Sequence, residues 1–109
     1  MNEELQAKLA IIQRGVLAGP FGYAVHGDEK RDEREISREE VVEAILSGEI
    51  IEDYPTHHYG PLCLILGWTA AVRPLHVLAS VAIRPRIVTV YEPDPERWER
   101  DLKTRRPKQ

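Results

Sequence analysis

The feature that most constrains the fold is a change in the spacing of apolar residues after Gly48. Four apolar runs follow it, at residues 50–54, 62–68, 75–83 and 87–91, and turn residues separate them. Such runs are typical of β-strands. Because only short connections join the runs, an antiparallel meander is the most economical topology. Two of the runs are apolar throughout, as expected for central strands of a sheet that helices cover.

Helical spacing dominates the part of the chain before these runs. Residues 3–14 place apolar side chains on one face, and Gly15 is expected to end this first helix. Ser37 and Glu40 have the spacing of a capping box, in which each side chain accepts a hydrogen bond from a backbone N–H group of the other residue. The sequence therefore predicts a second helix over residues 38–47.

A short helix is also predicted at the C-terminal end. Asp94 and Pro95 favour the start of a helix, and helical spacing would place Trp98 and Leu102 on one face. The predicted fold class is therefore α+β, with N-terminal helices packed on a four-stranded antiparallel sheet and a short C-terminal helix. With 109 residues, the chain is expected to form a single domain.

Composition excludes several classes of protein. The chain is 42% hydrophobic and 30% charged, which is typical of a globular protein, and no apolar run approaches the about 18 residues that a membrane span needs. The first residues lack the basic and then apolar layout of a secretion signal. Cys63 is the only cysteine, so no internal disulfide can form. We therefore expect a cytoplasmic protein without membrane association.

Metal chemistry is disfavoured by the positions of the four histidines and the cysteine. His57 and His58 are neighbours, so their side chains are expected to point in opposite directions, and Cys63 lies inside an apolar run where a buried thiol is usually inert. His26 and His76 lie far from each other in the chain. No common phosphate-, dinucleotide- or metal-binding motif is found either. No cofactor and no metal ion are therefore expected.

A polar segment, residues 24–35, carries the most suggestive pattern. If this segment is helical, His26, Lys30 and Arg34 lie along one face, because each is four residues from the next. The same spacing aligns acidic residues with each other, which costs helix stability. The positive stripe therefore indicates a constraint other than helix stability. The net charge of −3 argues against a general attraction to nucleic acid.

Several of these residues occur in an order that resembles a known family. The shared pieces are His26, Lys30, Arg34 and Ile36-Ser37, then residues 48–55, 63–67 and 75–77, then Val90-Tyr91, Pro93-Asp94 and Trp98. They resemble the bacterial "domain of unknown function" family forty-two fifty-eight. Members typically have Ala, Arg and Met where this chain has Gly27, Lys30 and Arg31.

The resemblance implies a division of the single domain, 1–109, and an architecture. Residues 1–22 would be an N-terminal helix and linker, 23–98 the family-like core, and 99–109 a basic C-terminal tail. The family's architecture is similar to that of RelE/BrnT-like ribonuclease toxins, which implies a likeness of fold and not of activity.

Two functions are compatible with these residues. In the first, the protein cleaves RNA without a metal: His26 and His76 act as acid and base, Lys30 and Arg34 hold the phosphate, and Tyr91 assists by hydrogen bonding. In the second, the protein is a non-catalytic binding or regulatory module of a paired bacterial system. Its partner is then a cognate protein rather than RNA, and His76 is a structural residue of the kind usual in apolar strands.

Overall fold

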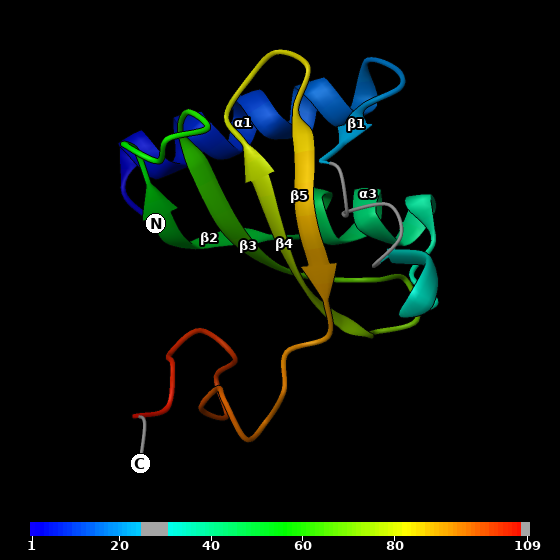
Figure 1. The fold of residues 1–109 in the computed structure, drawn as a ribbon, viewed down its shortest axis with the longest axis vertical. Helices are drawn as coiled ribbons and strands as arrows, with labels where there is room; N and C mark the ends of the chain where they lie inside the picture. The colour runs from blue at the N-terminus through cyan, green and yellow to red at the C-terminus, as the bar shows by residue number, and fades with distance from the viewer. Residues whose placement is uncertain (25–30, 108–109) are drawn as a thin grey trace.

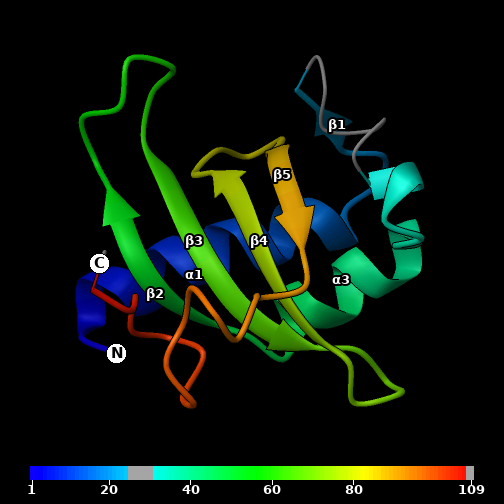
Figure 2. The same ribbon diagram turned by 60° about the horizontal axis from the view of Figure 1, so that its bottom comes forward.

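The computed structural model of the protein describes residues 1–24 and 31–107 (Figure 1). Its elements, in chain order, are α1 (Glu3–Leu17), β1 (Gly22–Tyr23), α3 (Arg38–Leu46), β2 (Glu49–Tyr54), β3 (Leu62–Trp68), β4 (Pro74–Ser80) and β5 (Arg86–Tyr91). Helices α1 and α3 cover one face of the sheet, and the C-terminal segment crosses the other face (Figure 2). In these two ranges, no helix is long and apolar enough to cross a membrane.

The sheet contains the predicted meander and one further strand. Strands β2 to β5 pair antiparallel in sequence order, as predicted, but the full order is β1-β5-β4-β3-β2. The prediction of a four-stranded antiparallel sheet is wrong because β1 pairs with β5 in parallel, with Gly22 opposite Arg86. A strand of two residues is too short to show any alternation of apolar and polar side chains. The fold class is α+β with a mixed, five-stranded sheet.

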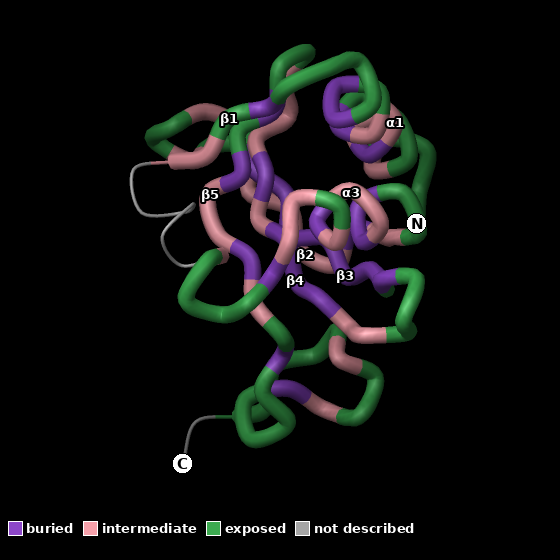
Figure 3. The backbone as a smooth tube through the Cα atoms, turned by 90° about the vertical axis from the view of Figure 1, so that its right-hand side faces the viewer, coloured by how far each residue is buried: buried purple, intermediate pink, exposed green. Residues whose placement is uncertain are grey.

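The two long helices bury their apolar sides against the sheet (Figure 3). The predicted capping box is confirmed, because Glu40 N–H donates to the Ser37 hydroxyl and Ser37 N–H donates to the Glu40 carboxylate. The predicted end of α1 at Gly15 is wrong, since the helix continues to Leu17. A Cβ at Gly15 would lie 2.3 Å from Cδ of Pro85. This glycine therefore allows a close approach to the loop before β5 rather than ending the helix.

The predicted C-terminal helix does not form. Backbone N–H groups of residues 97 and 98 bond the Asp94 carbonyl, which makes a single turn, and Trp98 then pairs with Arg105 in an isolated bridge. Leu102 has a positive φ of 61°, and the Asp101 carboxylate accepts hydrogen bonds from the backbone of residues 103 and 104. Such side-chain bonds to the local backbone compete with a helix. We call residues 94–107 the C-terminal segment.

Candidate functional site

The pairing of β4 with β5 brings His76 and Tyr91 together. The two residues are directly opposite in the register of the strands. Leu75 and Val77 belong to the core under the helices, so His76 between them faces the other side of the sheet. The Tyr91 hydroxyl lies 3.2 Å from Nδ1 of His76, and the rings meet edge to face. Two of the five predicted site residues therefore form a direct pair.

The second ring nitrogen of His76 determines where its proton lies. Nε2 is 2.7 Å from the backbone carbonyl oxygen of Leu102. A carbonyl can only accept a hydrogen bond, so Nε2 carries the proton. Burial lowers the pKa of His76, partly opposed by this bond to the carbonyl, so the ring is neutral near pH 7. Nδ1 is then unprotonated, and the Tyr91 hydroxyl donates to it.

His76 has no contact with solvent. Its exposed fraction is 0%, and the Trp98 ring packs edge-on against it at 4.4 Å between ring centroids. The C-terminal segment supplies both this ring and the Leu102 carbonyl. Both ring nitrogens of His76 are therefore paired with protein groups, and Tyr91 is its only side-chain hydrogen-bond partner among the described residues.

Tyr91 lies in the wall of a hollow on the open face of the sheet. We call this the first hollow; its volume is about 310 Å³, and it is lined by Tyr54, His57, Leu62, Leu64, Leu78, Thr89, Tyr91 and Arg105. Arg105 donates two hydrogen bonds to the Glu52 carboxylate, at 2.8 and 2.9 Å. The Tyr54 hydroxyl donates to the same carboxylate. The first hollow thus combines two phenols with a guanidinium over an apolar floor.

Arg34 lies beside this hollow, on an exposed part of the chain. Its Nη1 donates to the Val90 carbonyl at 2.7 Å and to the Thr89 hydroxyl at 3.3 Å. The guanidinium carbon is 5.9 Å from the centroid of the Tyr91 ring. Burial raises the pKa of Tyr91, and the nearby charges of Arg105 and Arg34 partly oppose that effect. Tyr91 therefore stays protonated at neutral pH between two positive charges.

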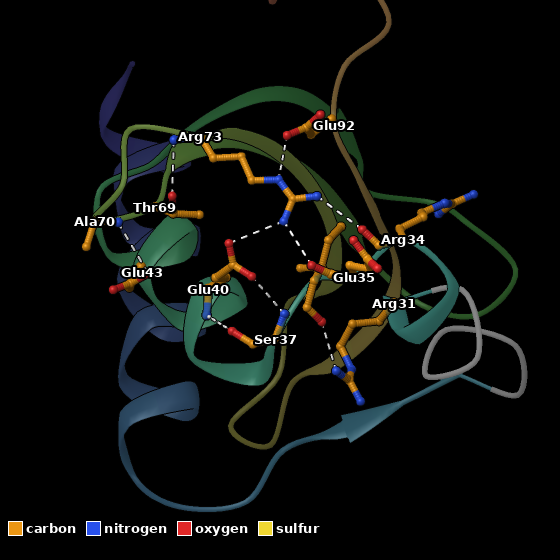
Figure 4. A network of polar contacts seen from close by, with 11 residues as sticks. Arg31, Arg34, Glu35, Ser37, Glu40, Glu43, Thr69, Ala70, Arg73 and Glu92 are labelled. Atoms are coloured by element: carbon orange, nitrogen blue, oxygen red, sulfur yellow. Dashed lines mark hydrogen bonds and ion pairs between the residues drawn. The ribbon is translucent and has the colours of Figure 1, made fainter.

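A polar network holds the backbone of Arg34 against the end of the sheet (Figure 4). The Arg73 guanidinium donates to the carbonyls of Arg34 and Glu35, at 3.1 and 3.0 Å. It also pairs with the carboxylates of Glu40 and Glu92. One side chain from the β3–β4 turn therefore connects the start of α3 and the end of β5 to the segment that carries Arg34.

The structure thus gathers three of the predicted residues, Arg34, His76 and Tyr91. His26 and Lys30 lie outside the described residues. Two residues of the first hollow were not predicted as site residues: Arg105, which the sequence places in a basic tail, and Tyr54. Alternation along residues 50–54 could have placed Tyr54 on one face together with Glu52, although nothing in the sequence pairs that face with residue 105.

No three His, Cys, Asp or Glu side chains are grouped as metal ligands in residues 1–24 and 31–107. The expectation that His57 and His58 point in opposite directions is wrong, because their rings stack on each other with centroids 4.4 Å apart. Cys63 is buried, and burial raises the pKa of its thiol to about 12. This thiol is therefore protonated at neutral pH and is a poor metal ligand.

The paired residues and Arg34 all fall inside the region that matches a family model. That region is residues 23–92, well over half of the chain, and its description is Domain of unknown function (DUF4258). The chain belongs to the DUF4258 family. The C-terminal segment with Trp98 and Arg105 lies beyond the matched region of the DUF4258 domain. No curated protein and no solved structure matches the chain. The expected likeness of this DUF4258 protein to RelE/BrnT-like toxins stays a prediction.

Proposed function

We propose that this DUF4258 protein is a metal-independent endoribonuclease of the RelE/BrnT-like, toxin type that acts in the cytoplasm. One observation carries the proposal: the Tyr91 hydroxyl donates to a neutral, water-shielded His76 in the wall of the first hollow. A phenol held in this way can take a proton from a substrate while it passes its own proton inward. Cleavage of RNA through its 2′-hydroxyl requires such a base and no metal.

In the proposed reaction, Tyr91 is the group that contacts the RNA. The Tyr91 oxygen takes the proton of the 2′-hydroxyl, and the Tyr91 proton moves to Nδ1 of His76. The freed electron pair of the 2′-oxygen forms a bond to phosphorus, and the bond from phosphorus to the 5′-oxygen breaks. The leaving oxygen takes a proton from His26, the other member of the acid–base pair that the sequence suggests. The products are a 2′,3′-cyclic phosphate and a 5′-hydroxyl.

The groups around the pair bear on this transfer in opposite directions. Burial lowers the pKa of His76 and so disfavours the imidazolium that forms, while the hydrogen bond to the Leu102 carbonyl and the negative charge of Glu52 partly oppose that effect. Arg34, next to the Tyr91 ring, and Arg105, which lines the same hollow as Tyr91, can stabilise the charge that accumulates on the phosphate. Lys30 is a further cation that the sequence assigns to the phosphate.

The proposal is tested with single-stranded RNA in the presence of a chelator. Tyr91→Phe removes only the hydroxyl, so cleavage should fall roughly 10²- to 10⁴-fold, the usual contribution of a general base. The matched control is Tyr23→Phe, which makes the same change on β1, at the edge of the sheet. Intact RNA after incubation with the wild-type protein would contradict the proposal, and so would equal rates for the two variants.

The full burial of His76 favours a second candidate, a non-catalytic binding or regulatory module of a paired bacterial system. In that case the His76–Tyr91 pair stabilises the C-terminal segment, and the exposed Arg34 contributes to a charged recognition surface for a cognate protein. This candidate predicts that Arg34→Ala weakens capture of the product of the adjacent reading frame, while Tyr91→Phe leaves capture unchanged.

A further inference from the structure

A second hollow lies on the same face of the sheet, next to the first. Its volume is about 650 Å³, and its lining includes Tyr59, Leu62, Ser80, Arg84, Arg86 and Val88. Leu62 also lines the first hollow, so the two hollows adjoin. The second hollow lies toward the β2–β3 and β4–β5 turns, which carry Tyr59 and Arg84.

An exposed aromatic ring, Tyr59, forms one side of the second hollow. It belongs to a cluster of three rings: His57 and His58 stack with centroids 4.4 Å apart, and the tilted Tyr59 ring lies 4.1 Å from His58 and 5.6 Å from His57. The exposed fraction of Tyr59 is 77%. Such an open aromatic ring, held by contacts with two others, suits stacking of a nucleic-acid base, because every base has a flat π-face.

Two arginines lie on the other side of this hollow. Arg84 and Arg86 are exposed, and neither has an ion pair with any residue in the described ranges. Arg73 and Arg105, in contrast, are held by carboxylates. A hydrogen bond of 2.8 Å from the Arg86 backbone N–H to the Ser80 hydroxyl fixes the turn that carries both cations. The pair is therefore positioned to meet a negatively charged ligand.

We propose that the second hollow binds the single-stranded RNA that continues from the scissile phosphate, with a base stacked on Tyr59 and phosphates at Arg84 and Arg86. This inference rests on the proposed ribonuclease function and names its substrate as an unpaired strand. Duplex RNA is excluded as the occupant because its bases are already stacked and cannot lie on an aromatic side chain. An acidic peptide would use the arginines but would leave the exposed Tyr59 ring without a role.

The test separates binding from cleavage. Fluorescence anisotropy measures the binding of a labelled single-stranded RNA of about 12 nucleotides to the Tyr91→Phe protein, which is expected to leave the RNA intact. Arg84→Ala/Arg86→Ala in that background should weaken binding at least tenfold. The slope of log K against the logarithm of the salt concentration should also become shallower by about 1.4, because each contact of an arginine with a single-strand phosphate contributes about 0.7 to that slope. The matched control, Arg97→Ala/Arg100→Ala, removes the same charge from the exposed C-terminal segment.

The stacking contact is tested in the same assay. Tyr59→Ala should weaken binding about tenfold, while Tyr59→Phe, which keeps the ring, should bind as well as the parent. The inference is overturned if the two arginine pairs have equal effects, or if duplex RNA binds as tightly as the single strand. A dinucleotide that is too short for the second hollow separates the two proposals. Suppose that wild-type protein cleaves the dinucleotide and that the two double arginine variants have equal effects on binding of the long strand. The inference about the second hollow then fails, while the ribonuclease proposal stands.

The ribonuclease function can also fail while the second hollow still binds RNA. If loss of Arg84 and Arg86 weakens binding and wild-type protein cleaves neither RNA, the second hollow is supported as a single-strand RNA site and the ribonuclease function fails.

Discussion

Replacement of Trp98 by alanine should release the C-terminal segment and expose His76. Trp98 is 3% exposed, and burial of an aromatic ring of this size removes roughly 200 Å² from water, worth about 5 kcal/mol at ~25 cal/mol per Å². The remaining attachments include the bond from His76 to the Leu102 carbonyl and the exposed Arg105–Glu52 pair, each worth about 1 kcal/mol. Together these two attachments contribute about 2 kcal/mol, less than half of what the burial of Trp98 contributes, so they cannot keep the segment ordered without it.

The experiment follows His76 by NMR while pH is varied. In wild-type protein, burial holds the pKa of His76 below its ordinary value of 6.5, and in Trp98→Ala the pKa should return toward that value. Amide exchange of residues 94–107 should become faster while the core strands stay protected. Trp68→Ala is the control, because Trp68 is 42% exposed and lies opposite Pro74 rather than opposite His76. An unchanged titration of His76 in Trp98→Ala would refute the claim that this segment seals the ring.

Three further predictions concern the His76–Tyr91 pair and the packing of the sheet. The unfolded chain binds a proton at His76 near pH 6.5 and the folded protein only at lower pH, so stability should decline as pH falls below 6.5. Urea unfolding at pH 7 and pH 5 should show this loss of stability, and the difference between the two pH values should be smaller in His76→Asn. Nitrogen-15 NMR at pH 7 should find the proton of His76 on Nε2; a proton on Nδ1 would mean that Tyr91 does not donate to it. Gly67→Ala should lower the free energy of unfolding, measured by thermal denaturation, by about 3 kcal/mol or more, because the new Cβ would lie 1.7 Å from the Ala44 carbonyl oxygen. Gly22→Ala is the control, because its Cβ would meet no atom within 4 Å.

The parts of the fold that local signals determine were predictable. The capping box of Ser37 and Glu40 and the strand-like runs after Gly48 depend only on neighbouring residues, and α3 and the meander follow from them. The parallel pairing of β1 depends on contacts with Arg86 and residue 87 at the far end of the chain. No periodicity in residues 22 and 23 could reveal it.

The candidate site was predictable in residue type but only partly in position. His76 and Tyr91 were chosen for their chemistry, and the antiparallel register places them together. Arg105 was missed because helical spacing at Trp98 and Leu102 suggested a helix. The segment instead folds back so that Trp98 is buried on His76, a long-range packing contact that outweighs local helix propensity.

The central claim is that this DUF4258 protein cleaves RNA through the 2′-hydroxyl without a metal. The most direct measurement compares two end-labelled single strands, one all RNA and one with 2′-deoxyribose at every position, incubated with wild-type protein and a chelator at pH 7. Cleavage of the RNA strand alone, with fragments that end in 2′,3′-cyclic phosphate, is the predicted result. Two intact strands, or cleavage of both, would contradict the claim.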